Sequence, residues 1–277
     1  MTPIKLFYNA RPQNFGDHIS ADLVQFAAQR PVTWTRLEDA ELFAVGSIIG
    51  FAQDRLEKGP ESWPYLWGSG LMMANGKWLF KAARLERVSA VRGPFTAHYF
   101  RGFRGAMGDP ALLCPRLVPA PAERGDTVLV PHHEQYKKQP EFIERAVATG
   151  LRIVDVRQAD PWNAVREIAS ASAVLSVSLH GLIVADAYRV PSIWVSDEVW
   201  LNGSGSFKFF DHFASIGRIE PGPLPLEDAV EAAARGAFNT RHLENIDRVA
   251  DRVLAAFPPA LRAEAAALET SNASLSE

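Results

Sequence analysis

The chain of 277 residues lacks most of the features that reveal a function at once. Its single cysteine, Cys114, excludes an internal disulfide and favours a reducing compartment. No apolar run reaches the roughly 18 residues that a membrane span needs, and the opening MTPIKLFYNA lacks the apolar core of a secretory signal. A net charge of −3 argues against a general nucleic-acid binder. We therefore expect a cytoplasmic protein that does not bind nucleic acid.

Common cofactor motifs are missing as well. The sequence has no HExxH or CxxC spacing for a metal, no GxxxxGK[ST] phosphate loop and no GxGxxG after its first predicted strand. We expect neither a metal nor a resident cofactor. The composition, 47% hydrophobic and 22% charged, is that of an ordinary globular protein.

Predicted strands and helices alternate along most of the chain. Apolar runs predict strands at residues 4–8, 42–49, 65–71, 87–91, 127–130, 151–156, 173–177 and 193–195. Helical spacing predicts helices at residues 18–29, 95–100, 139–149, 161–171, 207–216, 226–235 and 241–257. This rhythm predicts an α/β fold with two Rossmann-like, doubly wound domains that face each other across a cleft.

A Pro-rich stretch at residues 114–125, CPRLVPAPAERG, is the best candidate for a linker. We accordingly predict an N-terminal domain at residues 1–120 and a C-terminal domain with a helical extension at residues 126–260. Residues 261–277 are predicted to be a partly disordered tail.

The most informative segment is residues 173–195, AVLSVSLHGLIVADAYRVPSIWV, which predicts a strand, a tight turn, a helix and a second strand. His180 and Gly181 lie in the turn, at the carboxyl end of the first strand. Open parallel sheets bind ligands at that edge. His180 is therefore either a functional group or a buried histidine that caps the helix.

Other turns carry polar groups at predicted strand ends. Asp17, in the turn N-F-G-D, either caps a helix or contacts a substrate hydroxyl, and Arg92 either binds an anion or pairs with an acid. The turn G-D-P indicates a structural role for Asp109, because Asp before Pro favours a turn. His132 and His133 are either acid/base groups and phosphate ligands or part of an exposed loop.

The order of these turns resembles that of the polysaccharide pyruvyl transferase family, in particular its succinoglycan and xanthan ketal-pyruvate transferases. The segments that carry the resemblance are N-F-G-D, V-R-G-P, G-D-P-A-L-L and S-L-H-G-L-I-V-A-D-A-Y-R-V-P, within residues 5–217. The resemblance implies two Rossmann-like domains arranged as in a B-type glycosyltransferase. It also implies transfer of a carboxyethylidene group from phosphoenolpyruvate to two hydroxyls of a bacterial exopolysaccharide sugar, which forms a cyclic ketal and releases phosphate.

One position departs from the family pattern. Many members have arginine two residues before the histidine, as in S-x-R-L-H-G, whereas this chain has Ser178. If that arginine grips the donor, then Arg92, Lys137, Lys138 or Lys208 must supply the charge here.

These considerations give each candidate residue a role. His180 is the expected acid/base group, because a histidine that titrates near neutrality suits proton transfer, or else a partner of the phosphate. Asp17 orients or deprotonates an acceptor hydroxyl. The expected donor-binding residues are Arg92, Ser178, Gly181, Lys208, His132 and Lys137. The expected acceptor-binding residues are Asn14, Gly16 and Ser69.

The expected partners are phosphoenolpyruvate and a glycan or lipid-linked oligosaccharide. Because such acceptors are usually lipid-linked, peripheral association with the inner membrane is a further expectation. Two other functions stay open: a nucleotide-sugar-dependent glycosyltransferase whose basic residues bind a diphosphate, and a non-catalytic component of an exopolysaccharide assembly complex.

Overall fold

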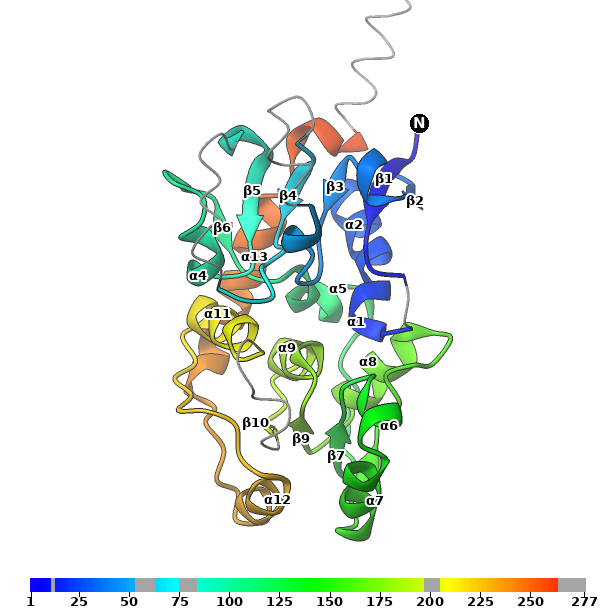
Figure 1. Cartoon of the computed structure of the whole chain (residues 1–277), viewed down its shortest axis with the longest axis vertical. Helices are drawn as coiled ribbons and strands as arrows, with labels where there is room; N and C mark the ends of the chain where they lie inside the picture. The colour runs from blue at the N-terminus through cyan, green and yellow to red at the C-terminus, as the bar shows by residue number, and fades with distance from the viewer. Residues whose placement is uncertain (11–12, 53–62, 75–83, 197–204, 264–277) are drawn as a thin grey trace, which may run out of the picture.

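The computed structural model describes residues 1–10, 13–52, 63–74, 84–196 and 205–263. They contain two parallel β-sheets, one in the upper and one in the lower half of Figure 1. The six-stranded sheet has the order β2-β1-β3-β4-β5-β6, and the four-stranded sheet has the order β10-β9-β7-β8. Every pairing in both sheets is parallel. The α/β class is therefore confirmed, and the arrangement as two domains across a cleft stays a prediction.

The strands are short and mostly buried on both faces. The six-stranded sheet comprises β1 (Ile4–Phe7), β2 (Val32–Trp34), β3 (Leu42–Phe43), β4 (Tyr65–Trp67), β5 (Val88–Val91) and β6 (Ala106–Met107). The four-stranded sheet comprises β7 (Thr127–Val130), β8 (Arg152–Ile153), β9 (Ala173–Ser176) and β10 (Ser192–Trp194). Apolar runs without alternation are what a parallel sheet covered by helices requires.

Helices cover both sheets and fill the region between them (Figure 1). The α-helices are α1 (Phe15–His18), α2 (Ser20–Ala28), α4 (Pro94–Ala97), α5 (Cys114–Leu117), α6 (Gln135–Lys138), α7 (Pro140–Ala148), α8 (Pro161–Ala169), α9 (Leu179–Ala187), α11 (Phe207–Ile216), α12 (Leu226–Ala234) and α13 (Ile246–Ala255). Short 3-10 helices are η1 (Leu37–Asp39), η2 (Ile49–Ala52), η4 (Leu85–Arg87), η5 (Pro110–Leu113), η6 (Arg241–Asn245) and η7 (Pro259–Leu261). One buried apolar cluster includes residues of both sheets, for example Leu6 and Val174.

The chain returns to the first sheet at its C-terminal end. Helix α13 packs against η5 and β6, and the Trp67 indole of β4 donates a hydrogen bond to the Val253 carbonyl oxygen at 2.7 Å. The predicted C-terminal domain at residues 126–260 does not anticipate this return. Its boundaries otherwise stay a prediction, and most of the predicted tail, residues 264–277, lies outside the described residues.

Several predicted elements differ from the structure, and three of them show why. The strand predicted at residues 42–49 ends at Phe43, because Gly46 has a φ of +105° that a strand cannot continue through. The helix predicted at residues 241–257 is divided into η6 and α13. The predicted linker begins with helix α5, in which Cys114 is fully buried.

Candidate active site

A cavity of about 100 Å³ lies where strand ends of the two sheets meet. Its walls are built from segments that follow β1, β3, β4, β7 and β9, together with the start of α11. The lining residues are Asn9, Asn14, Asp17, Ser47, Ile48, Phe51, Met72, His132, His133, Ser178, Leu179, His180 and Lys208. The carboxyl edge of a parallel sheet is the usual place for a ligand, so this cavity is the candidate active site.

The turn before α9 is fixed by one hydroxyl. Ser176 Oγ accepts a hydrogen bond from the Ser178 amide at 3.1 Å and donates to the Ser178 carbonyl oxygen at 2.8 Å. A Cβ added at Gly181 would lie 2.2 Å from this hydroxyl oxygen. Gly181 therefore supports the turn from behind and is not among the residues that line the cavity, and its donor contact stays a prediction.

His180 stands in the first turn of α9 and faces the cavity with 7% of its surface exposed. Its Nε2 atom is buried and has no hydrogen-bond partner among the described residues. Burial, assisted by the charges of Lys208 and Arg92, lowers the pKa of His180 to about 3. The imidazole is thus neutral at pH 7, which corrects the expectation of a group that titrates near neutrality in the ligand-free protein.

Asp17 lies in α1 and lines the same cavity. Its Oδ2 accepts a hydrogen bond from Asn14 Nδ2 at 3.0 Å. Burial raises the pKa of Asp17 to about 6, against the lowering effects of this bond and of Lys208. Asp17 does not occupy the N-cap position, which belongs to Asn14, so capping does not account for it. A carboxylate that ionises close to neutrality can exchange protons with a bound substrate.

Lys208 is the cation of the cavity wall. It begins helix α11 together with Phe207, and burial, followed by the charge of Arg92, lowers the pKa of its ammonium to about 8. Of the four cations proposed to replace the family arginine, Lys208 is the one that lines the cavity in the described part of the chain. The ammonium of Lys208 and the imidazole of His180 therefore face one space.

Two consecutive residues anchor α11. Asp211 accepts hydrogen bonds from the Thr96 amide at 2.9 Å and the Thr96 hydroxyl at 2.6 Å, both in α4. His212 Nε2 lies 2.9 Å from Oδ2 of Asp186 in α9, and both side chains are fully buried. Asp186 also contacts His242 at 2.8 Å and Arg218 at 3.4 Å. Helix α11, and with it Lys208, is thus held by α4, which follows β5 of the first sheet, and by α9, which follows β9 of the second.

Arg92 lies behind the cavity wall rather than on it. Its guanidinium donates to Ser47 Oγ at 2.5 Å, to the Leu71 carbonyl oxygen at 2.5 Å and to Asp211 Oδ2 at 3.1 Å. The side chain has no exposed surface. Arg92 therefore holds the cavity residue Ser47 and contributes positive potential, and its direct contact with the donor stays a prediction.

The remaining donor candidates fall into two groups. His132 and Ser178 line the cavity, with His133 beside His132 at a ring-centroid distance of 4.2 Å. Burial drives the pKa of both histidines down, so neither lies in a simple exposed loop. Lys137 is exposed on α6 and does not line the cavity, and its donor contact stays a prediction.

The acceptor candidates are also divided. Asn14 lines the cavity. Gly16 packs against the imidazole, since a Cβ at Gly16 would lie 2.0 Å from His180 Nδ1. Ser69 is fully buried and donates to the Gly46 carbonyl oxygen at 2.9 Å. Gly16 and Ser69 therefore shape the cavity from behind, and a direct contact of either with an acceptor stays a prediction.

The predicted structural role of Asp109 is confirmed. Its Oδ1 accepts a hydrogen bond from the Ala111 amide at 2.9 Å and so caps η5. The buried Oδ2 has no partner among the described residues, and burial raises the pKa of Asp109 to about 7.

The sequence marks neither several wall residues nor the anchors of α11 as functional. Ser47 lies within the strand predicted at residues 42–49, and Phe51 and Met72 follow predicted strands, so nothing in their sequence marks them as cavity residues. Asp211, one anchor of α11, and Asp186, the partner of the other anchor, lie in apolar helical patterns, where an isolated acid is a signal of a buried polar contact.

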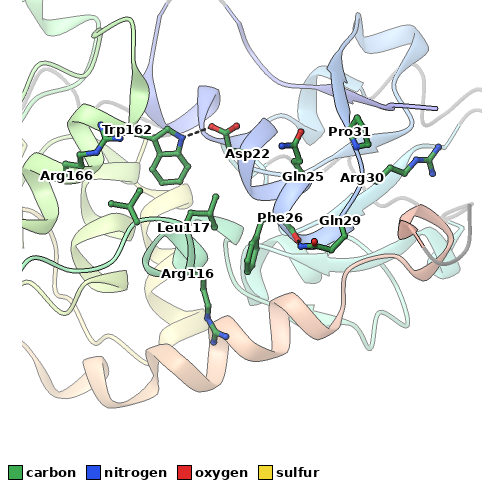
Figure 2. A pocket seen from close by; sticks show the side chains of 11 residues that line it. Asp22, Gln25, Phe26, Gln29, Arg30, Pro31, Arg116, Leu117, Trp162 and Arg166 are labelled. Carbon is green, nitrogen blue, oxygen red and sulfur yellow. Dashed lines mark hydrogen bonds between the residues drawn. The ribbon is translucent and has the colours of Figure 1, made fainter. Parts of the chain in front are cut away.

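A larger hollow, of about 720 Å³, lies between α2, α5 and α8 and is drawn in Figure 2. Trp162 borders it and donates a hydrogen bond from Nε1 to Asp22 Oδ2 at 2.6 Å. Its arginines are engaged elsewhere: Arg116 pairs with Asp251 and Arg166 with Asp160. Because helices form its walls and no strand end opens into it, this hollow is a weaker candidate for the chemistry.

The described residues contain no group of three or more His, Cys, Asp and Glu side chains that could hold a metal ion. Among the same residues, no helix is both long enough and apolar enough to cross a membrane.

Comparison with known proteins finds relatives that are similar to part of the chain. Residues 90–198 match the family model described as polysaccharide pyruvyl transferase. The chain is 31% identical to the succinoglycan biosynthesis protein ExoV of Rhizobium meliloti (strain 1021) over 157 residues, which is 54% of this chain and 47% of that protein. It is 23% identical to the uncharacterized protein L143 of Acanthamoeba polyphaga mimivirus over 158 residues, 54% of each. The matches thus span about half the length of these curated relatives.

Proposed function

Because residues 90–198 match the family model described as polysaccharide pyruvyl transferase, we propose that the chain transfers a pyruvyl group to a sugar in exopolysaccharide synthesis. The donor is phosphoenolpyruvate, and two hydroxyls of the acceptor sugar become a cyclic ketal. The matched segment contains Arg92, His132 and His180 and excludes Asp17 and Lys208. The observation that carries the proposal is the buried, unpartnered Nε2 of His180, which shares a cavity with the ammonium of Lys208.

The donor needs positive charge, since it carries a phosphate and a carboxylate. The ammonium of Lys208 lies on the cavity wall, and the buried guanidinium of Arg92 adds positive electrostatic potential from behind the wall. The N-terminus of the nine-residue helix α9 points amides toward the same space. In this arrangement Lys208 takes the place of the family arginine that Ser178 lacks.

The reaction moves two protons. The first acceptor hydroxyl attacks the carbon that bears the phosphate, while the donor methylene carbon takes up a proton and becomes a methyl group. The carbon–oxygen bond to phosphate then breaks, and the second hydroxyl closes the ring. Of the two hydroxyl protons, one ends on the methyl carbon and the other on the released phosphate.

Two side chains are suited to carry these protons. Asp17, with its pKa near 6, accepts the proton of the first hydroxyl. His180 becomes an acid only after the donor has bound, because the anionic donor offsets the charges of Lys208 and Arg92 that help to keep the imidazole neutral. General acid–base groups in such positions contribute typically about 10²–10⁴-fold.

The acceptor would enter past Phe51. This ring is 58% exposed and lines the cavity, so its face is available to a sugar ring. Asn14 lies on the same wall and offers an amide to a sugar hydroxyl.

The test is incubation of the chain with phosphoenolpyruvate and a panel of galactosides, mannosides and glucosides. Mass spectrometry should find the mass gain of a carboxyethylidene group on one acceptor, with equal release of phosphate. The variant His180→Gln should release none, while circular dichroism shows an unchanged fold. Near-normal turnover in that variant would remove His180 from the chemistry.

Two other results would favour the other functions. Thermal stabilisation by uridine nucleotides, without response to phosphoenolpyruvate, would indicate a nucleotide-sugar-dependent glycosyltransferase. No response to either ligand, together with tight binding to another synthesis protein, would indicate a non-catalytic component of an assembly complex.

A further inference from the structure

A second groove, of about 720 Å³, runs along the outer edge of the six-stranded sheet. It lies between the edge strand β6, the end of α11 and the helix α13, which are neighbours in the upper left of Figure 1. The lining residues are Ser89, Pro94, Arg104, Gly105, Ala106, Met107, Ala214, Ser215, Arg248, Val249, Arg252, Ala255 and Ala256.

The charged side chains that line the groove are all positive. Arg104, Arg248 and Arg252 line it, all three are exposed, and the lining contains no acidic residue. Arg248 donates a hydrogen bond to Asn245 Oδ1 at 2.8 Å, and no acidic partner of the three arginines is found among the described residues. Their positive potential is therefore open to a ligand.

The acids of α13 do not neutralise this potential. Asp247 pairs with Arg189 at 2.5 Å, and Asp251 pairs with Arg116, whose side chain points toward this helix in Figure 2. Both acids are thus matched by arginines that lie outside the groove. Arg248 and Arg252, four residues apart, project from the same face of the helix.

Between the charges the groove is apolar. Met107 is 41% exposed at the sheet edge. The other apolar lining residues are Pro94, Ala106, Ala214, Val249, Ala255 and Ala256. Cationic side chains that surround an exposed apolar floor match a surface with phosphate groups above hydrocarbon, which is the chemistry of a phospholipid headgroup layer.

The groove is close to the candidate active site. Lys208 and Ala214 are six residues apart in α11, which corresponds to about 9 Å along the helix axis. A molecule held at the groove would therefore lie near the start of α11, which lines the cavity.

We propose that this groove docks the protein on a membrane through anionic phospholipid headgroups. The three arginines are spread over a loop and a helix on an open surface, which suits a charged layer better than one small anion. Each arginine near an anionic membrane strengthens binding by about fivefold. Docking depends on neither phosphoenolpyruvate nor the pyruvyl transfer proposed above.

The experiment is co-sedimentation of the chain with phosphatidylcholine vesicles that contain or lack phosphatidylglycerol. We expect binding only to the anionic vesicles, and loss of that binding as added salt shortens the range of the charges. The double variant Arg248→Gln/Arg252→Gln should bind about 25-fold more weakly, from two arginines at about fivefold each.

The matched control is Arg145→Gln/Arg235→Gln, which removes the same charge. Both control arginines are exposed and pair with glutamates, Arg145 with Glu227 and Arg235 with Glu231. They lie at α7 and the end of α12, at the opposite end of the molecule from β6 (Figure 1). This variant should bind as the unaltered chain does, and thermal melts should show that both double variants are folded.

Three outcomes would overturn the proposal. These are equal binding to neutral and anionic vesicles, an equal loss in the two double variants, and no vesicle binding at all. Binding to a soluble polyanion such as heparin with no binding to vesicles would equally overturn it and would assign the groove to an anionic polymer. None of these results bears on phosphate release, so failure of docking and failure of the proposed catalysis are separate.

Discussion

Arg92 and Asp211 form an ion pair in which neither side chain has any exposed surface, although 119 residues separate them in the chain. The Nη2–Oδ2 distance is 3.1 Å. Asp211 belongs to α11, the helix that begins with Phe207 and Lys208, and Arg92 follows β5 of the first sheet. The pair therefore fixes the cationic wall of the cavity relative to the first sheet.

Removal of one partner of this pair should be costly. Asp211→Asn leaves Arg92 with an uncompensated buried charge, and such a loss typically costs about 3–5 kcal/mol of folding free energy. Chemical denaturation would measure it. The matched variant Asp251→Asn breaks the exposed pair with Arg116 and should cost at most about 1 kcal/mol. Equal losses in the two variants would contradict the buried pair as an anchor.

A methyl group at Gly16 should disable the site by displacing the His180 imidazole, although no proposed catalytic residue is replaced. The new Cβ would lie 2.0 Å from His180 Nδ1, so the imidazole must move. A displacement of about 1 Å can cost about 100-fold in rate, and phosphate release should fall by that order. Gly125→Ala is the control, because its Cβ would meet its nearest atom, the Ser170 carbonyl oxygen, at 3.5 Å. A fully active Gly16→Ala variant would show that the His180 position is not critical.

The sequence was sufficient for the α/β class and for the order of the elements around His180. Residues 173–195 predicted a strand, a turn and a helix with His180 at the sheet edge, and β9 and α9 have this order. Strong local signals such as the apolar runs determine elements, because each depends on neighbours within one helix or strand.

The features that could not be predicted from the sequence depend on contacts between distant segments. Arg92 was expected on the cavity wall, and its pairing with Asp211 turned it inward. The low pKa of His180 follows from burial and from nearby positive charges, neither of which can be read before the chain is folded. The strand predicted at residues 42–49 failed for a similar reason, because Gly46 turns the chain and brings Ser47 to the cavity.

Catalysis should depend on pH in a bell-shaped manner. Asp17 must be ionised to accept a proton, so kcat/KM should fall as the pH drops through about 6. Lys208 must be charged to hold the donor, so kcat/KM should fall as the pH rises through about 8.

Substitution of Lys208 tests whether its ammonium causes the fall of kcat/KM at alkaline pH. Lys208→Arg should shift that limb to higher pH, because a guanidinium stays charged, and Lys208→Gln should raise the KM for phosphoenolpyruvate at every pH. An alkaline limb unchanged in Lys208→Arg would assign it to another group.

Binding of phosphoenolpyruvate should take up a proton at His180. Burial and the charges of Lys208 and Arg92 keep this imidazole neutral at pH 7 in the ligand-free protein, with a pKa of about 3. A bound phosphate and carboxylate favour the imidazolium, so the pKa of His180 rises and the complex holds more protons than its separate components. Because linkage is reciprocal, donor affinity should therefore increase as the pH is lowered from 8 toward 7. Isothermal titration calorimetry in buffers of different ionisation enthalpy measures the proton count directly. The count should drop in His180→Gln, which retains Lys208 and Asp17, and an equal count in the two proteins would show that His180 is not the group that becomes charged.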